Sequence, residues 1–184
     1  MATFSSCAPA VTAEISATLP GKDINGEFVV FKKLMFSVLF AFFGPLAAAA
    51  ELQIEFGQQK WGFDQDQLLS IAPATLTVQS PWDDMPSTFT GVYLQDLLTH
   101  LTAEADTLTA TALNDYQVTI EIPEAVNAGA FIAILRDGKP MPIRNKGPFW
   151  IIFDWNEASS ETKVSLLSSW SIWQLKSLQL QPKQ

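Results

Sequence analysis

Strand-sized apolar runs separated by short polar turns constrain the fold of this chain more than any other feature. They are densest between Asn114 and Trp155, where the strand candidates are Gln117–Ile122, Ala130–Leu135 and Phe149–Phe153. Turns are expected at Asp137-Gly138 and Asn145-Lys146-Gly147, because Asp, Asn and Gly adopt the backbone conformations that tight turns require. The stretch therefore predicts a β-meander, in which consecutive strands pair with one another.

Period-two alternation of apolar and polar residues predicts further strands outside this stretch. They are Glu51–Phe56, Thr75–Gln79, Asp106–Leu113 and the end of Ile172–Leu180. The expected helices are short, and they are Phe63–Ile71 with Asp64 as its cap, Tyr93–Leu101 with one leucine-rich buried face, and a turn or two within Val164–Trp170. Loops are expected at Gly57–Gly62, Ser80–Ser87 and Asn156–Lys163. Strands outnumber helices without a βαβ alternation, so we expect an α+β fold of mostly antiparallel strands with a few short helices.

A short apolar run, Leu34–Leu46, follows Lys32 and Lys33 and precedes Ala47–Ala50. A basic start, an apolar centre and small residues at the end are typical of a secretory signal. The alternative is a membrane anchor, but the run is about 13 residues, whereas a spanning helix needs roughly 20. We therefore predict that residues 30–50 are a signal peptide cleaved after Ala50, and that residues 51–184 form a periplasmic or secreted domain with no membrane attachment.

Residues 1–29 are rich in Ser, Thr and Ala and show no periodicity, and signal peptides normally begin only a few residues before their lysines. We expect translation to start near Val30, so that Met1–Val29 is either an extension without ordered structure or not translated.

Charge and cysteine content exclude several functions. The formal net charge is −8, which makes a nucleic acid an unfavourable partner because phosphate backbones repel an acidic surface. Cys7 is the only cysteine, and it precedes the predicted signal. The mature domain therefore has no disulfide, no thiol nucleophile and no thiolate metal ligand.

No motif in the sequence predicts a catalytic or metal-binding residue. His100 is the only histidine, and its place after a leucine-rich helix face favours a helix-end role over a Ser–His–Asp triad. Several carboxylates are expected in turns, where a paired acid site is the alternative. They are Asp83, Asp84, Asp115, Asp137 and Asp154.

Ligand-binding candidates come from three other groups. The basic residues Arg136, Lys139, Arg144 and Lys146 flank the two predicted turns and form either solvated hairpin tips or an anion site. Most of the six tryptophans are expected in the core, whereas Trp82 lies in a loop and is the best candidate for a ligand-facing ring. Asp115 and Tyr116 lie between two strands, where a buried hydrogen bond between them would fix the junction.

Six short motifs form an ordered series over about 130 residues. They are Ser80-Pro81-Trp82, Phe89–Leu98, Ala112–Tyr116, Asp137–Met141, Lys146–Ile152 and Trp173–Lys176. In order and spacing, the series resembles the molybdopterin-binding oxidoreductase domain family of sulfite oxidase and its bacterial periplasmic relatives, most closely a small, secreted, single-domain branch. The resemblance implies the α+β sulfite-oxidase-type molybdopterin domain fold and a pterin-linked molybdenum cofactor.

One residue of the family pattern is missing. Catalytic members ligate molybdenum through a cysteine upstream of the segment that matches Phe89–Leu98, and the matching segment here, Leu76–Ser80, has no thiol. A thiolate anchors and tunes such a metal, and glutamine or serine is not equivalent.

We therefore expect a molybdopterin-oxidoreductase-like domain without thiolate-ligated molybdenum, which binds a small anionic ligand or a protein partner such as a membrane sensor or redox protein. The alternative is a molybdopterin-dependent oxidoreductase that holds its cofactor without a protein cysteine. The substrate, the oligomeric state and whether any cofactor is bound do not follow from the sequence.

The signal-peptide prediction has a direct test. We expect N-terminal sequencing of the exported protein to begin at Glu51, because the signal is removed after Ala50. Mass spectrometry of the unprocessed precursor should contain no peptide from Thr3–Val29, and recovering such a peptide would disprove the start near Val30.

Overall fold

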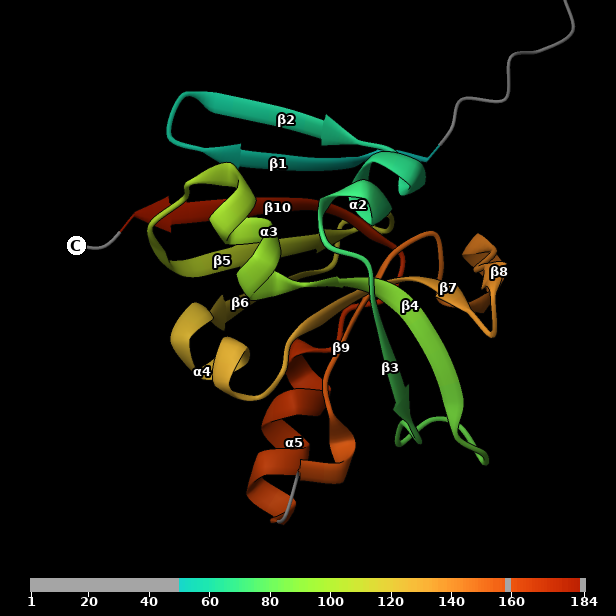
Figure 1. The fold of residues 1–184 in the computed structure, drawn as a ribbon. Helices are drawn as coiled ribbons and strands as arrows, with labels where there is room; N and C mark the ends of the chain where they lie inside the picture. The colour runs from blue at the N-terminus through green and yellow to red at the C-terminus, as the bar shows by residue number, and fades with distance from the viewer. Residues whose placement is uncertain (1–49, 158–159, 183–184) are drawn as a thin grey trace, which may run out of the picture. The chain divides into compact units, whose positions relative to one another are not determined.

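The computed structural model describes residues 50–157 and 160–182, and two β-sheets form its framework (Figure 1). The strands are β1 (Leu52–Phe56), β2 (Gln59–Phe63), β3 (Ala74–Val78), β4 (Ser87–Tyr93), β5 (Ala105–Ala112), β6 (Gln117–Glu121), β7 (Phe131–Arg136), β8 (Lys139–Pro140), β9 (Trp150–Ile152) and β10 (Leu175–Pro182). The helices are α2 (Gln65–Ile71), α3 (Leu94–Leu101), α4 (Ile122–Asn127) and α5 (Glu161–Trp170), with 3-10 turns η1 (Ile143–Asn145) and η2 (Trp155–Glu157).

Strand pairing confirms the predicted fold class, α+β with mostly antiparallel strands. Sheet A has the order β2-β1-β10-β5-β6, and sheet B has the order β3-β4-β7-β8, with β9 also paired to β7. Within the described residues, every strand pair is antiparallel except β1 with β10. The predicted extension and all of the predicted signal except Ala50 lie outside the described residues.

Sheet A has one buried and one more exposed face, because successive side chains of each strand point to opposite sides. One apolar row crosses four strands in register, from Phe56 through Leu180 and Leu108 to Ile120. The last three side chains of this row are buried. The neighbouring positions on β5 are threonines that remain partly exposed, as period-two alternation requires.

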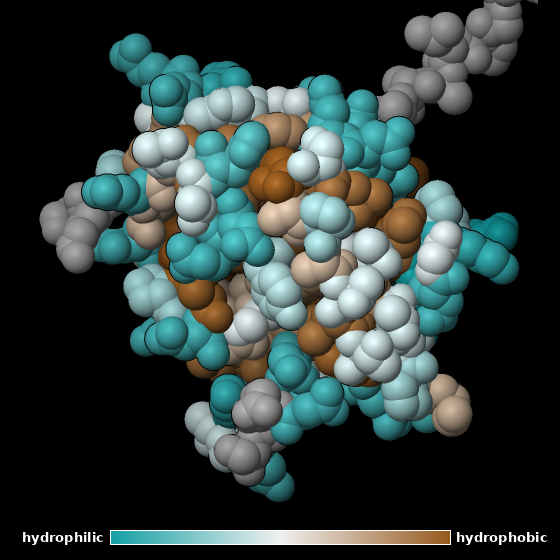
Figure 2. Space-filling view, in the orientation of Figure 1, coloured by the Kyte–Doolittle hydropathy of each residue, from teal (hydrophilic) through white to brown (hydrophobic). Residues whose placement is uncertain are grey.

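Two predicted helices form as the sequence pattern indicates. Asp64 caps α2 by accepting a hydrogen bond from the backbone nitrogen of Gln67, whose side chain bonds back to the backbone nitrogen of Asp64. Helix α3 buries its four leucines on one face, as their spacing predicts. On the face shown in Figure 2, hydrophobic residues reach the surface in separate small areas among hydrophilic ones.

The predicted β-meander is wrong in its first half. Strand β6 pairs with β5 in sheet A, whereas β7 pairs with β4, β8 and β9 in sheet B. Helix α4, which the sequence analysis missed, connects the two sheets and carries Pro123 in its first turn, where proline needs no hydrogen-bond partner. Strand β2 lies largely in the predicted loop Gly57–Gly62. The sequence analysis missed it because only Trp61 and Phe63 are apolar and a glycine, which is depleted in strands, stands between them.

Gly91 allows sheet B to form where β4 crosses β7. A Cβ atom at this position would lie 2.0 Å from the backbone oxygen of Ile132, and the strand register shifts at the same place. We expect Gly91→Ala to lower the free energy of unfolding by about 2 kcal/mol, because the backbone of β7 would have to move. Urea denaturation measures this change, with Thr90→Ala as the control at a cost below about 1 kcal/mol. Equal costs for the two variants would contradict the close approach.

Candidate functional site

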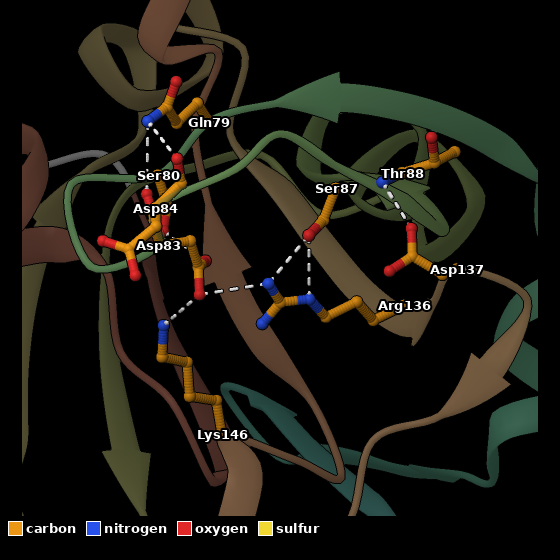
Figure 3. A network of polar contacts seen from close by, with 9 residues as sticks. All are labelled: Gln79, Ser80, Asp83, Asp84, Ser87, Thr88, Arg136, Asp137 and Lys146. Atoms are coloured by element: carbon orange, nitrogen blue, oxygen red, sulfur yellow. Dashed lines mark hydrogen bonds and ion pairs between the residues drawn. The ribbon is translucent and has the colours of Figure 1, made fainter.

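The loop of residues 79–86, here called the Trp82 loop, joins β3 to β4 and is held by its own hydrogen bonds (Figure 3). Ser80 is buried, and its hydroxyl donates to Oδ2 of Asp83 at 2.6 Å. The amide of Gln79 donates to the backbone oxygens of Asp83 and Asp84, at 3.3 and 3.1 Å. These bonds leave Oδ1 of Asp83 directed toward two cations (Figure 3).

Asp83 is shared by Arg136, at the end of β7, and Lys146, which follows η1. Its Oδ1 lies 3.0 Å from Nη2 of Arg136 and 3.4 Å from Nζ of Lys146. The three side chains are 13%, 21% and 19% exposed, so solvent screens them less than a surface pair. Arg136 also donates to the hydroxyl of Ser87 from Nε and Nη2, at 3.0 and 2.7 Å. One carboxylate therefore ties the Trp82 loop to two other segments.

The pKa values of this group reflect burial and charge together. Burial raises the pKa of Asp83, but the hydrogen bond from Ser80 and the cations Lys146 and Arg136 outweigh it and hold the pKa below its ordinary value of 3.8. Burial lowers the pKa of Lys146, and the favourable effect of Asp83 only partly offsets it. Asp83 therefore offsets part of the free energy that is lost when the charged ammonium of Lys146 is buried.

Trp82 packs among three other tryptophans. Its ring centroid lies 6.0 Å from that of Trp150 and 5.7 Å from those of Trp155 and Trp173. Nζ of Lys146 lies 4.4 Å from the ring centroid of Trp150 and 5.6 Å from that of Trp82, which is cation–π geometry. The ion pair of Asp83 and the tryptophan cluster therefore meet at Lys146.

A pocket of about 280 Å³ opens beside Trp82, and we call it the Trp82 pocket. The Trp82 loop, the β5–β6 turn and the segment from α5 to β10 supply its lining. The lining residues are Trp82, Ala112, Asn114, Tyr116, Ser168, Ser169, Ser171, Ile172 and Trp173. The aromatic side chains are 39% exposed for Trp82, 54% for Tyr116 and 41% for Trp173. Ser171 is buried, and its hydroxyl has no hydrogen-bond partner among the described residues.

The predicted site residues are only partly brought together. Trp82 and Tyr116 line the pocket, and Arg136 and Lys146 share Asp83. Lys139 and Arg144 are exposed and belong to neither group.

The buried hydrogen bond predicted between Asp115 and Tyr116 is wrong. The Asp115 side chain is 80% exposed and pairs with Lys176 at 3.3 Å. Asp115 has φ of 62°, so it serves the β5–β6 turn, as the sequence predicts for the carboxylates of this group.

The sequence analysis did not identify three residues that belong to the site. Asp83 was assigned to a turn, because nothing local indicates that Arg136 and Lys146 reach it across 53 and 63 positions of sequence. Trp173 was expected in the core with the later tryptophans, but it is half exposed. Ser171 carries no sequence signal beyond its place between Trp170 and Trp173.

His100 lies in the last turn of α3, which confirms the predicted helix-end position, and its ring contacts the edge of Phe63. No group of three or more His, Cys, Asp or Glu side chains in the described part of the chain is placed to hold a metal ion.

The residues at the site do not fit the cofactor that the resemblance implies. Ser80 lies in the segment that would supply the metal-binding cysteine, and its hydroxyl is engaged by Asp83. Arg136 and Lys146, which could hold a pterin phosphate, are engaged by the same carboxylate.

A scan against models of protein families finds no match to this sequence, and a search of curated proteins finds none either. Of the helices in residues 50–157 and 160–182, none has the length and apolar character needed to cross a membrane.

The Asp83 ion pairs make stability depend on pH in the acid range. Because the folded pKa of Asp83 is lowered, its contribution is complete above pH 3.8 and is lost as the pH falls through the folded pKa. We expect Asp83→Asn to cost about 2 kcal/mol at neutral pH, because two partly buried cations lose their anion. Denaturant titrations at several pH values should show this deficit shrinking in acid.

Asp84→Asn is the matched control, since Asp84 is exposed on the same loop and its substitution should change stability by less than about 0.5 kcal/mol. A deficit of Asp83→Asn that stays constant from neutral to strongly acidic pH would contradict the ion-pair account.

Proposed function

We propose that this chain is an exported binding domain with a sulfite-oxidase-type fold, and that it takes up a small ligand in the Trp82 pocket. One observation carries the proposal: exposed aromatic rings line a cavity whose wall also includes Ser171, a buried serine with an unpaired hydroxyl. Apolar walls with a few placed polar groups are the usual composition of a small-molecule site.

The pocket is costly if it serves stability alone. Two indoles and a phenol around one cavity leave apolar area in water that folding would otherwise bury. An unpaired buried hydroxyl costs about 1–3 kcal/mol relative to a paired one. A ligand that covers the rings and pairs the hydroxyl removes both costs, which supports binding as the role of this region.

The Asp83 ion pairs support the same proposal by fixing the pocket wall. Asp83 follows Trp82 directly, so its bonds to Arg136 and Lys146 restrain the backbone that carries the indole. A wall that is ordered before binding loses less conformational entropy when the ligand arrives. Arg136 and Lys146 thus have a positioning role in this proposal. The sequence analysis expected an anionic ligand, but no cationic side chain lines the pocket to bind one.

We expect Trp173→Ala to weaken ligand binding by more than about tenfold, because it removes one pocket wall. Saturation-transfer NMR with a fragment library of sugars, heterocycles, phosphates and carboxylates measures this on the mature domain. Leu166→Ala is the matched control, since Leu166 is 44% exposed on α5 but lies outside the pocket lining. If no fragment signal depends on Trp173, the proposal is wrong.

Metal analysis of the purified protein distinguishes the proposed binding domain from the alternative, a molybdopterin-dependent oxidoreductase. We expect protein from a molybdopterin-competent host to carry no stoichiometric molybdenum by elemental analysis, because the described residues offer no thiolate to hold it. If the protein carries molybdenum and pterin in equal amounts with itself, it is a molybdopterin-dependent oxidoreductase and the proposed binding function is wrong.

A further inference from the structure

The lining of the Trp82 pocket carries no formal charge. None of its nine residues is Asp, Glu, Lys, Arg or His. The nearest charges along the chain are engaged elsewhere, since Asp83 holds Arg136 and Lys146 and Asp115 pairs with Lys176. A charged ligand would lose its hydration without meeting an opposite charge, so the chemistry of the pocket selects a neutral one.

Two pocket walls stand at a right angle. The indole planes of Trp82 and Trp173 are inclined by 90°, with their centroids 5.7 Å apart. A flat aromatic ligand that stacks on one of two perpendicular rings meets the other with its edge. A puckered saturated ring has C–H groups that point in several directions, and these positively polarised hydrogens suit the negative face of an indole.

The remaining lining consists mainly of groups that both donate and accept hydrogen bonds. The hydroxyl of Ser169 donates to the backbone oxygen of Leu166 at 2.6 Å and keeps its acceptor lone pairs. The hydroxyl of Ser171 has no partner, and rotation of its side chain between staggered positions can turn it toward a ligand. A ligand with several hydroxyl groups matches such a lining, because each hydroxyl also donates and accepts.

From these features we infer that the Trp82 pocket binds a neutral carbohydrate of one or two sugar rings. The inference rests on the proposed function and adds the chemical class of the ligand. The cavity volume of about 280 Å³ lies just below the usual range of small-molecule sites, which suits a ligand of this size.

Isothermal titration of the mature domain with glucose, galactose, N-acetylglucosamine, maltose and cellobiose tests the inference. At least one sugar should bind, and Trp173→Ala should abolish the heat signal. Ser171→Ala should weaken the same sugar roughly three- to tenfold, because one hydrogen bond to the ligand is lost. The unliganded Ser171→Ala variant should be no less stable than the natural protein, since its serine hydroxyl has no partner to lose.

Ser165→Ala is the matched control, since Ser165 is exposed on α5, the helix that ends directly before Ser171, and lies outside the pocket lining. It should leave the sugar affinity unchanged. Sugar binding that survives both Trp173→Ala and Ser171→Ala would place the sugar elsewhere and overturn the inference.

Probes of other classes separate this inference from the proposed function. If inorganic phosphate, indole or 6-hydroxymethylpterin gives Trp173-dependent signals while all the sugars fail, the pocket is a binding site but the carbohydrate assignment is wrong. If no probe of any class binds, the proposed function and the inference both fail.

Discussion

The arrangement of the Trp82 region depends on one carboxylate that serves two cations. Asp83 comes from a β-hairpin loop, Arg136 from the end of β7 and Lys146 from the turn after η1. The pairing of β4 with β7 brings the first two segments side by side, and the shared carboxylate ties all three together. A cation and an anion that are both largely removed from water cost hydration energy, and each needs the other to offset that cost. These ion pairs, together with the loop's own hydrogen bonds, hold the loop in this position.

The charge of Lys146 links this ion pair to the aromatic cluster. Its ammonium lies against the face of Trp150 and near that of Trp82, where little water remains to solvate it. The lowered pKa of Lys146 is the result of that desolvation, and Asp83 and the two rings supply the compensation. Electrostatics and aromatic packing are thus one structural unit here, and the pocket wall formed by Trp82 belongs to it.

Local patterns in the sequence predicted the individual helices and strands better than they predicted which strands pair with one another. The leucine spacing of α3, the Asp64 cap of α2 and the alternation of β1 and β5 are local features, and each formed as expected. The assignment of β6 and β7 to different sheets is set by distant strands and could not be read from their own residues. The site shows the same division, because the loop position of Trp82 was predictable but the convergence of Asp83, Arg136 and Lys146 was not.

The parallel pairing of β1 with β10 has a consequence for biosynthesis. Strand β10 follows every other described strand along the chain, yet it lies between β1 and β5 in the middle of sheet A. Until β10 has emerged from the ribosome, β1 and β5 have no common neighbour and the sheet remains two separate halves. A nascent form arrested before Leu175 would expose the unpaired edges of β1 and β5, and it would be a ready substrate for chaperones and proteases.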